Sequence, residues 1–441
     1  MSLFGLSFGL ERYIGYSIYL AGILAFLLSI FWKPLVGIWY LTPLIPLQTT
    51  RYRMAAFPLG ESVVGIILLG VAIGVVRRRQ GLFAANPWSL VLAVYVVFTL
   101  GSLLSDAGYL GVRLAEWKDY MLMPLLFFLV AAAVSDAREM KIILLLMCAA
   151  VFVMDRSFWN AVSDRDFSTF SRDLQEGGAM GYAGVQGLAA FNAQFSWFLV
   201  ALSGSQTARL ARWGCLGLAL FGANCTMYSF SRGAYVSFLA GWIFMGCVKI
   251  RKLLVILAIF VMTWASVVPP AVRDRILMTY DPNQGELDHA AGVRLVLWDE
   301  AMNLFSSNPV VGAGFNTYAH MEHFNNYADT HNIYVKVLVE TGVAGLLLFL
   351  WLLGKTFLTG YGVFRRAQDP FFRSLGLGLA VWIVCTAVSS FFGDRWTYLQ
   401  ISGYMWILAG FVARAIRIEV STAEEAPARG LEIAFDCGGA R

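Results

Sequence analysis

Three polar segments in an otherwise apolar chain carry residue types that can do chemistry. The first is the segment 229–233, Ser-Phe-Ser-Arg-Gly, in which Arg232 lies at the boundary between two apolar runs. An arginine near the end of a membrane helix can simply extend its charge to the lipid surface. Gly233 and the two serines favour a crowded polar pocket instead, where the planar guanidinium would match phosphate oxygens. Because a charge at the centre of a membrane helix costs roughly 2.5–3.5 kcal/mol, a buried arginine is usually functional.

The second segment spans residues 292–315 and begins Gly-Val-Arg-Leu-Val-Leu-Trp. Apolar residues recur after Arg294 at helical spacing, which predicts an amphipathic helix on or near the membrane surface with Arg294 in its first turn. A solvated charge on that helix is the alternative interpretation. The turn 309–315, Pro-Val-Val-Gly-Ala-Gly-Phe, resembles a phosphate-binding glycine loop only weakly, because it lacks the Gly-Lys-Ser/Thr motif and a preceding strand.

The third segment contains His331, where a long polar stretch meets the next apolar run. An imidazole can accept a proton near pH 7 and so act as a general base, although a lone histidine is more often structural. Lys336 and Glu340 follow with i,i+4 spacing and could simply pair with each other. In the loop between the last two apolar runs, Arg395 could join the same pocket or pair with Asp394.

A metal site is the alternative use of these histidines. His320 and His323 have the i,i+3 spacing of two ligands on one helix face, and His289, Asp329 and His331 lie in the same segment. The His-Glu-x-x-His motif is absent, however, and no cysteine joins the cluster. The sequence therefore predicts neither a metal nor another cofactor.

The composition shows what kind of protein must position these residues. Of 441 residues, 59% are hydrophobic and only 14% are charged, against about half and a quarter in an average globular domain. This excludes a disordered chain, a fibrous repeat and an ordinary soluble enzyme. The formal charge is +5, but no basic run is longer than residues 77–79, so no nucleic-acid partner is expected. The six cysteines show no Cys-x-x-Cys spacing and are expected to be small buried hydrophobes.

The apolar residues form runs of about 15 to 23 residues, about the length needed to cross ~30 Å of hydrocarbon. The chain is therefore predicted to be an all-α polytopic membrane protein with about twelve transmembrane helices. A thirteenth would be present if residues 35–48, interrupted by two prolines, also cross. The first span, 14–32, has no signal cleavage site and is expected to be retained. The other expected spans are residues 57–76, 87–104, 119–134, 141–155, 189–204, 213–228, 234–248, 253–268, 332–354, 374–392 and 397–413.

The distribution of lysine and arginine among the loops predicts the orientation of these spans in the membrane. Five alternate short loops hold fourteen lysines and arginines, whereas the short loops between them hold six, so the first set is expected to be cytoplasmic. Both long polar segments, 155–188 and 269–331, then lie on the opposite side, and any chemistry is expected there. We expect a membrane bundle over 1–268, the long loop with amphipathic helices, C-terminal spans over 332–413, and a disordered cytoplasmic tail over 414–441. This placement disfavours enzymes that use ATP or nucleotide sugars.

Three stretches together resemble a known family: SRGAYVSF, GVRLVLWDEAMNLFSSNPVVGAGFNTY and DTHNIYVKVLVETGVAGLL. They are similar to the signature region of the bacterial O-antigen ligase and O-antigen polymerase superfamily, and most like a ligase. The resemblance implies a metal-independent inverting glycosyltransferase of lipopolysaccharide biosynthesis in the inner membrane, with its active site facing the periplasm. It also implies an undecaprenyl-pyrophosphate-linked glycan as donor and lipid A–core as acceptor.

The same resemblance implies roles for individual residues. Arg232 and Arg294 would clamp the pyrophosphate, and His331 would be the general base. The further candidates for binding the substrates are Arg113, Lys118, Asn332, Tyr334, Lys336 and Arg395.

Other functions remain open alongside the ligase. Repeat-unit polymerases and protein O-oligosaccharyltransferases share this signature region and differ in the acceptor. A flippase or transporter of lipid-linked oligosaccharide is a more distant alternative. It is disfavoured because the two halves of the chain show no internal repeat and the polar segments gather on one side of the membrane.

Overall fold

The computed structural model describes residues 11–104, 108–175, 184–278, 280–281, 286–287, 289–321 and 329–436. Within these ranges the chain is helical apart from its connections and one short antiparallel hairpin, in which β1 (Tyr280–Asp281) pairs with β2 (Glu286–Leu287). The predicted all-α class is therefore confirmed. The α-helices are α1 (Glu11–Phe31), α2 (Leu35–Leu44), α3 (Gln48–Tyr52), α4 (Val63–Arg77), α5 (Ser89–Leu103), α6 (Leu110–Ala133), α7 (Ala137–Val162), α8 (Gly184–Ser203), α9 (Arg209–Met227), α10 (Arg232–Val248), α11 (Lys252–Val267), α12 (Pro270–Leu277), α13 (His289–Ser307), α14 (Ile333–Arg366), α15 (Pro370–Ser389) and α16 (Leu399–Asp436).

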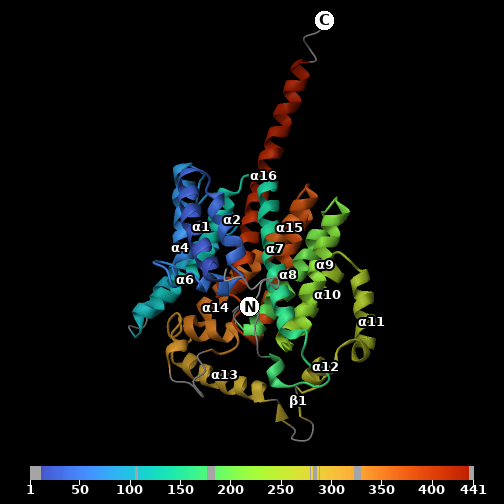
Figure 1. The fold of residues 1–441 in the computed structure, drawn as a ribbon. Coiled ribbons are helices and arrows are strands. Elements are labelled where there is room, and N and C mark those ends of the chain that lie inside the picture. The colour runs from blue at the N-terminus through green and yellow to red at the C-terminus, as the bar shows by residue number, and fades with distance from the viewer. Residues whose placement is uncertain are drawn as a thin grey trace.

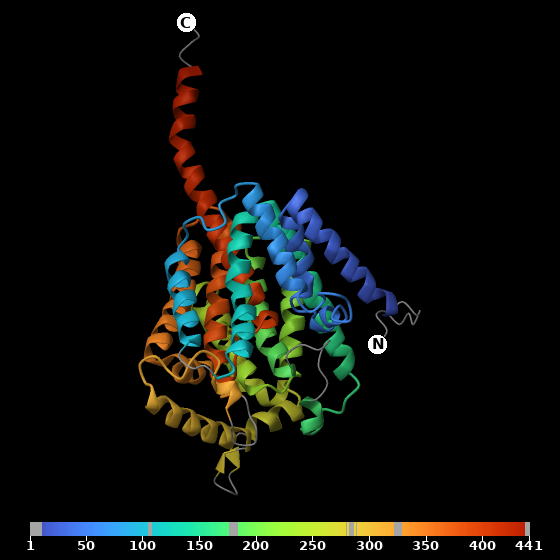
Figure 2. The ribbon, with the colours of Figure 1, turned by 90° about the vertical axis from the view of Figure 1, so that its left-hand side faces the viewer.

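The long helices stand side by side in one bundle, and α13 lies across its lower end (Figures 1 and 2). The degree of burial separates central from peripheral helices. The apolar window of α8 is 89% buried and that of α16 is 83% buried, whereas α11 contributes no buried residue. Helix α11 stands at the edge of the bundle in Figure 1 with large apolar side chains exposed along it. Such a surface is unfavourable in water and suits contact with lipid.

The predicted count of twelve spans is not confirmed. Six of the described helices are long and apolar enough to cross a membrane, or seven if α11 and α12, which bend by 107°, are taken as one span. Several other apolar helices are shorter. Residues 35–48 form the ten-residue α2 and the start of α3, and ten residues extend only about 15 Å, half the hydrocarbon thickness. Helix α2 therefore does not cross on its own and packs inside the bundle, with Leu35 and Ile38 fully buried.

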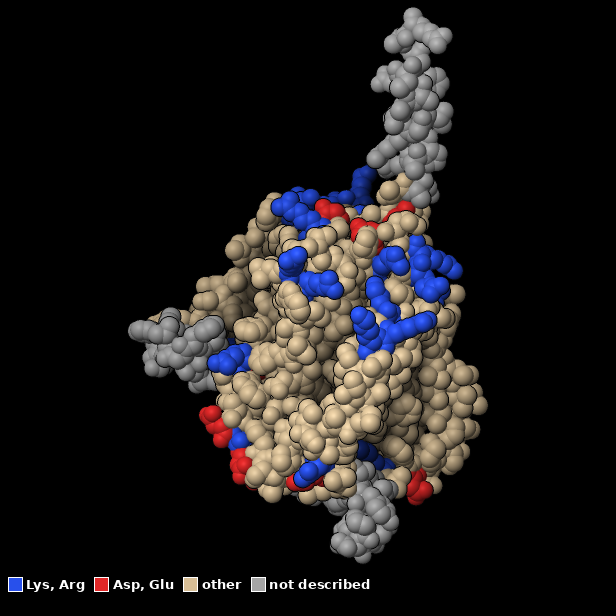
Figure 3. Space-filling view, turned by 90° about the vertical axis from the view of Figure 1, so that its right-hand side faces the viewer, with Lys and Arg blue, Asp and Glu red and all other residues tan. Residues whose placement is uncertain are grey.

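The two ends of the bundle differ in charge. In Figure 3 most of the lysine and arginine side chains gather near the end from which α16 emerges, away from α13. This is the separation that the loop counts predicted. Helix α16 continues to Asp436 and projects from the bundle (Figure 2).

The long segment between α11 and α14 contains the predicted amphipathic helix as α13. Because α13 begins at His289, Arg294 lies in its second turn rather than its first. Leu297 and Ala301 are fully buried one turn apart, and Ala301 packs with Tyr318 and Val339. Trp298 also donates from Nε1 to the carbonyl oxygen of Thr330 at 2.9 Å. These contacts hold α13 against the start of α14.

The glycine turn 309–315 packs against the backbone of α14 around Gly342, and we call this contact the clasp. Gly312 and Gly342 both have positive φ, at +76° and +67°, a conformation that only glycine adopts readily. A Cβ on Gly342 would overlap the backbone of Val310, and a Cβ on Gly312 would overlap the backbone of Glu340. The two backbones can approach this closely only because neither residue has a side chain. Four backbone hydrogen bonds join them: Ala313 N to Val339 O at 3.0 Å, Gly314 N to Glu340 O at 2.8 Å, Val343 N to Pro309 O at 2.9 Å and Ala344 N to Val310 O at 3.1 Å.

Candidate functional site

His331 lies directly before α14 in a strained, well-supported turn. Its φ is +51°, in the left-handed region that costs a non-glycine residue about 1–2 kcal/mol. The next residue, Asn332, caps α14 by accepting hydrogen bonds from the backbone N–H of Tyr334 at 3.0 Å and of Val335 at 3.4 Å. On the other side, Thr330 donates from Oγ1 to the carbonyl of Asn332 at 2.8 Å. Strain held in place by such contacts is typical of functional sites.

The surroundings of His331 favour the neutral imidazole. Burial lowers the pKa of His331, and Arg294 and Arg395 lower it further by repelling a second positive charge. The negative charge of Asp329 raises the pKa of His331 instead, and its Oδ2 lies 3.7 Å from His331 Nδ1. Asp329 Oδ1 also accepts from the His331 backbone N–H at 3.1 Å. The net pKa lies below the ordinary value of 6.5, so near pH 7 the ring can accept a proton.

The structure brings Arg395 to the same place from the far end of the chain. Its neighbour Asp394 is buried and holds the loop by accepting from the backbone N–H of Trp396 at 3.0 Å and of Thr397 at 2.9 Å. Arg395 folds over Gly393, where a Cβ would lie 3.0 Å from one guanidinium nitrogen. The charges of Arg294 and Arg395 interact with each other as well as with His331. The charge of Arg395 interacts more strongly with those of Asp394 and Asp329 than with that of Arg294, and its guanidinium is a group that can bind an anionic ligand.

Arg232 begins α10 beside the same loop. Gly233 packs against it so closely that a Cβ would lie 2.6 Å from Cβ of Phe392. Ser229, three residues before Arg232, lines a cavity together with His331 and Arg395. The first and third predicted catalytic segments thus line one cavity, although Arg232 and His331 lie 99 residues apart in sequence.

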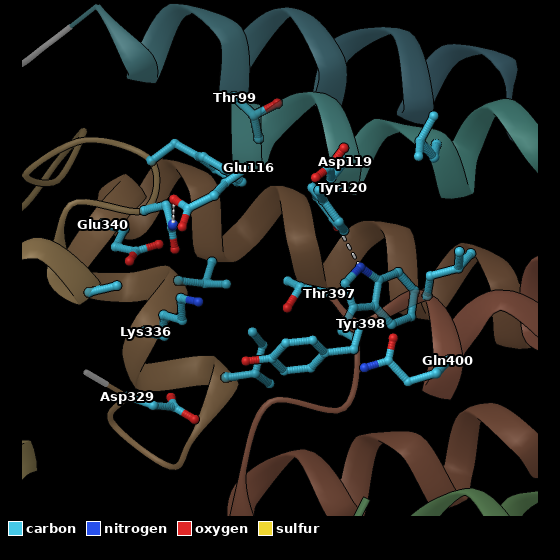
Figure 4. A pocket seen from close by; sticks show the side chains of 18 of the residues that line it. Thr99, Glu116, Asp119, Tyr120, Asp329, Lys336, Glu340, Thr397, Tyr398 and Gln400 are labelled. Atoms are coloured by element: carbon cyan, nitrogen blue, oxygen red, sulfur yellow. Dashed lines mark hydrogen bonds between the residues drawn. The ribbon is translucent and has the colours of Figure 1, made fainter. Parts of the chain in front are cut away.

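Two cavities meet at His331. The smaller has a volume of about 470 Å³ and lies between the start of α8, Ser229 and the loop 393–398. The larger has a volume of about 800 Å³ and extends from His331 toward α3, α5 and α6 (Figure 4). Asp329, His331 and Tyr398 line both cavities. A base at such a junction can reach groups bound on either side.

Two of the other predicted binding residues lie in α14. Lys336 lines the larger cavity, and its Nζ is 3.6 Å from Oδ2 of Asp394, so it also supports the loop that carries Arg395. Tyr334 donates from its hydroxyl to the carbonyl of Ala387 at 2.7 Å. This hydrogen bond joins α14 to α15. Asn332 caps its own helix, so the side chains of both residues make contacts that support the fold.

The remaining two predicted binding residues lie in α6. Arg113 is fully buried and donates from Nε to the carbonyl of Phe315 at 2.8 Å and from Nη1 to that of Gly108 at 3.3 Å. It thereby supports the segment after the clasp. Lys118 is exposed, with Nζ 3.4 Å from Oδ1 of its neighbour Asp119.

The histidines of the predicted metal alternative are not grouped in the described structure. His320 stacks on Tyr109, and its Nε2 is 3.2 Å from Oε2 of Glu116. His323 and the side chain of His289 lie outside the described residues. Within the described part of the chain, no group of three histidine, cysteine or acidic side chains is arranged to hold a metal.

Sequence reasoning missed the carboxylates of the larger cavity. Glu116 and Asp119 both line it, and their i,i+3 spacing on a largely apolar helix would have indicated a shared polar face. Tyr398, which lines both cavities, follows the last predicted loop with no local signal that would have marked it.

One family comparison matches the part of the chain that builds this site. Residues 216–350 match the family model described as O-antigen ligase. The resemblance to the O-antigen ligase superfamily is confirmed. The match extends from α9 into α14 and contains Arg232, Arg294 and His331, whereas Arg395 lies beyond it. Together with the apolar helices, the O-antigen ligase match indicates a multi-pass membrane protein related to transferases of lipid-linked glycans. No curated protein matches the chain.

Proposed function

We propose that this protein transfers a glycan from an undecaprenyl-pyrophosphate donor to a hydroxyl group of an acceptor, with lipid A–core as the expected acceptor. The reaction takes place on the periplasmic side of the inner membrane, at the end of the bundle covered by α13. One observation carries the proposal: His331, whose pKa is lowered by burial and by the charges of Arg294 and Arg395, lies where two cavities meet, and Arg395 lines one of them. This arrangement provides a base, a cationic site for a diphosphate and separate room for two substrates.

The chemistry follows from these positions. His331 takes the proton from the acceptor hydroxyl as its oxygen attacks the anomeric carbon, and the bond from that carbon to the diphosphate oxygen breaks. Attack from the side opposite the leaving group inverts the configuration. Arg294, Arg395 and Arg232 stabilise the negative charge that grows on the departing diphosphate, in the way that fixed dipoles and charges stabilise transition states. In this scheme the guanidinium groups do the work of a divalent cation.

We assign the diphosphate to the smaller cavity, because Arg395 lines it and the N-terminus of α10 lies beside it. Helix N-termini favour bound phosphate groups. The larger cavity is then left for the acceptor, with His331 on the boundary between the two.

Transfer by the purified protein tests this proposal. The protein is incubated in EDTA with an undecaprenyl-pyrophosphate glycan and lipid A–core, and the products are separated on a gel. We expect one discrete shift of the acceptor. A ladder formed from the donor alone would indicate a polymerase, and movement of donor across liposomes without any product would indicate a transporter.

Charge-removal variants complete the same test. Arg232→Ala and Arg294→Ala should each fold in the membrane and transfer almost nothing, because each removes part of the charge that stabilises the leaving group. Near-normal transfer by either folded variant would contradict its assignment to the diphosphate site.

The pH dependence of transfer should respond to Asp329. Its negative charge raises the pKa of His331 against the effects of burial and the two arginines, so Asp329→Asn should lower that pKa further. The amide keeps an oxygen that can accept from the His331 backbone. The acid limb of the kcat/KM profile, which follows protonation of the base, should therefore move to lower pH in the variant and stay in place in Asp329→Glu. A limb that stays in place or moves to higher pH in Asp329→Asn would show that the base is another group.

A further inference from the structure

The larger cavity is lined by more carboxylates than cations. Two cations also line it: Lys336, whose charge interacts with those of Glu340 and Asp394, and Arg51, whose charge interacts with that of Asp119. Negative charge therefore predominates in its walls. The five carboxylates of the lining come from the loop before α4, from α6, from the segment before α14 and from α14 itself: Glu61, Glu116, Asp119, Asp329 and Glu340.

Among these carboxylates, the surroundings of Glu340 most clearly indicate a bound ligand. It is only 3% exposed, and within the described structure its Oε1 has no hydrogen-bond partner. Figure 4 shows it on one side of the cavity with Glu116 and Lys336. A buried acidic group in a helix apolar enough to span the membrane is costly and marks a substrate path more often than a structural contact. The clasp of Gly312 and Gly342 holds the backbone of Glu340 in this position.

Aromatic rings supply the rest of the wall. Tyr120 stacks on Phe315 with ring centroids 6.0 Å apart. The Tyr120 hydroxyl accepts from Trp396 Nε1 at 2.6 Å and donates to the hydroxyl of Tyr95 at 3.1 Å. Because Tyr120, Tyr95 and Trp396 are buried and tied to one another, this side of the cavity is rigid. Flat rings of this kind offer an apolar surface with polar edges, which suits the C–H face of a sugar ring.

We propose that the larger cavity binds a neutral, phosphate-free sugar, the one whose hydroxyl accepts the glycan. This inference rests on the proposed function for its place in the reaction. Ionised carboxylates can only accept hydrogen bonds, and sugar hydroxyls can donate them. A phosphate group has little to donate at neutral pH and is repelled by the ionised carboxylates of the wall. Recognition then works partly by repulsion of the wrong ligand, and a phosphorylated sugar is disfavoured in the larger cavity.

A binding experiment tests this directly. The full-length protein in lipid nanodiscs is titrated calorimetrically with a neutral hexose trisaccharide and with its monophosphate ester. We expect the neutral trisaccharide to bind at least tenfold more tightly. Removing two exposed charges, in Glu116→Gln with Asp119→Asn, should reduce that ratio to less than threefold, mainly by improving binding of the phosphate ester. Both residues are exposed, so folding should be preserved.

Asp164→Asn is the matched control, because Asp164 is an exposed carboxylate outside the lining of this cavity. It should leave the ratio unchanged. Equal or tighter binding of the phosphate ester by the unmodified protein, or no binding of either sugar, would overturn the inference. The titration needs no donor and no turnover. Selective binding without any transfer would therefore contradict the proposed function alone, and transfer without selective binding would contradict this inference alone.

Discussion

His331→Ala is expected to lower the rate of glycan transfer by about 10²–10⁴-fold, the usual contribution of a general base. The loss should appear mainly in kcat, because the side chain acts on the proton that moves in the transition state and contributes little to holding either substrate. Initial rates with saturating donor, measured from about pH 4 to pH 9 so that the range includes the acid limb, provide the test. The variant should also lose the acid limb of its pH profile, since the group that titrates there is gone.

The variant must be shown to be folded before its rate is interpreted. The strained φ of +51° at His331 is set by contacts of Thr330 and Asn332, so alanine should keep the turn and the thermal midpoint should change little. His331→Asn, whose side chain tolerates the left-handed conformation better, serves as a second variant and should be equally inactive. Full activity of either variant across this pH range would remove His331 from the mechanism.

Gly342→Ala is expected to destabilise the folded protein by at least about 3 kcal/mol, which is among the larger effects of single substitutions. The left-handed conformation costs alanine about 1–2 kcal/mol. In addition, the new Cβ would overlap the backbone of Val310, and relief of this overlap would break hydrogen bonds of the clasp. The yield of membrane-inserted protein and the thermal midpoint in detergent should both fall.

Gly354 provides a matched control in the same helix. It has helical geometry, and a Cβ built on it meets nothing within 4 Å. Gly354→Ala should therefore be neutral, or stabilising by about 0.5–1 kcal/mol, because alanine loses less entropy than glycine when a helix forms. If the two variants were equally stable, the clasp would not contribute to the fold as the structure indicates.

The sequence alone determined the helical membrane architecture and the three segments that build the site. Apolar runs and helix periodicity are local properties, and they suffice because each helix satisfies its own backbone hydrogen bonds. The same local reasoning singled out Arg232 and His331 at the ends of apolar runs and Arg294 in a helix of the long polar segment. The number of spans stays a prediction: six or seven of the described helices are long and apolar enough to cross, and residues 35–48, which the sequence left open, contain the short packed helix α2.

Only the tertiary structure decided what surrounds those residues. Arg395 and Tyr398 line the same cavity as His331 from the loop before α16. The sequence left Arg395 open between this pocket and a pair with Asp394, and it did not indicate Tyr398. The glycine turn 309–315 holds α14 rather than a phosphate, because its partner is the backbone at Gly342. Arg113 lies in the interior as a support for Phe315. The acidic cavity likewise depends on carboxylates from four separate parts of the chain, and it exists only because packing brings those parts together.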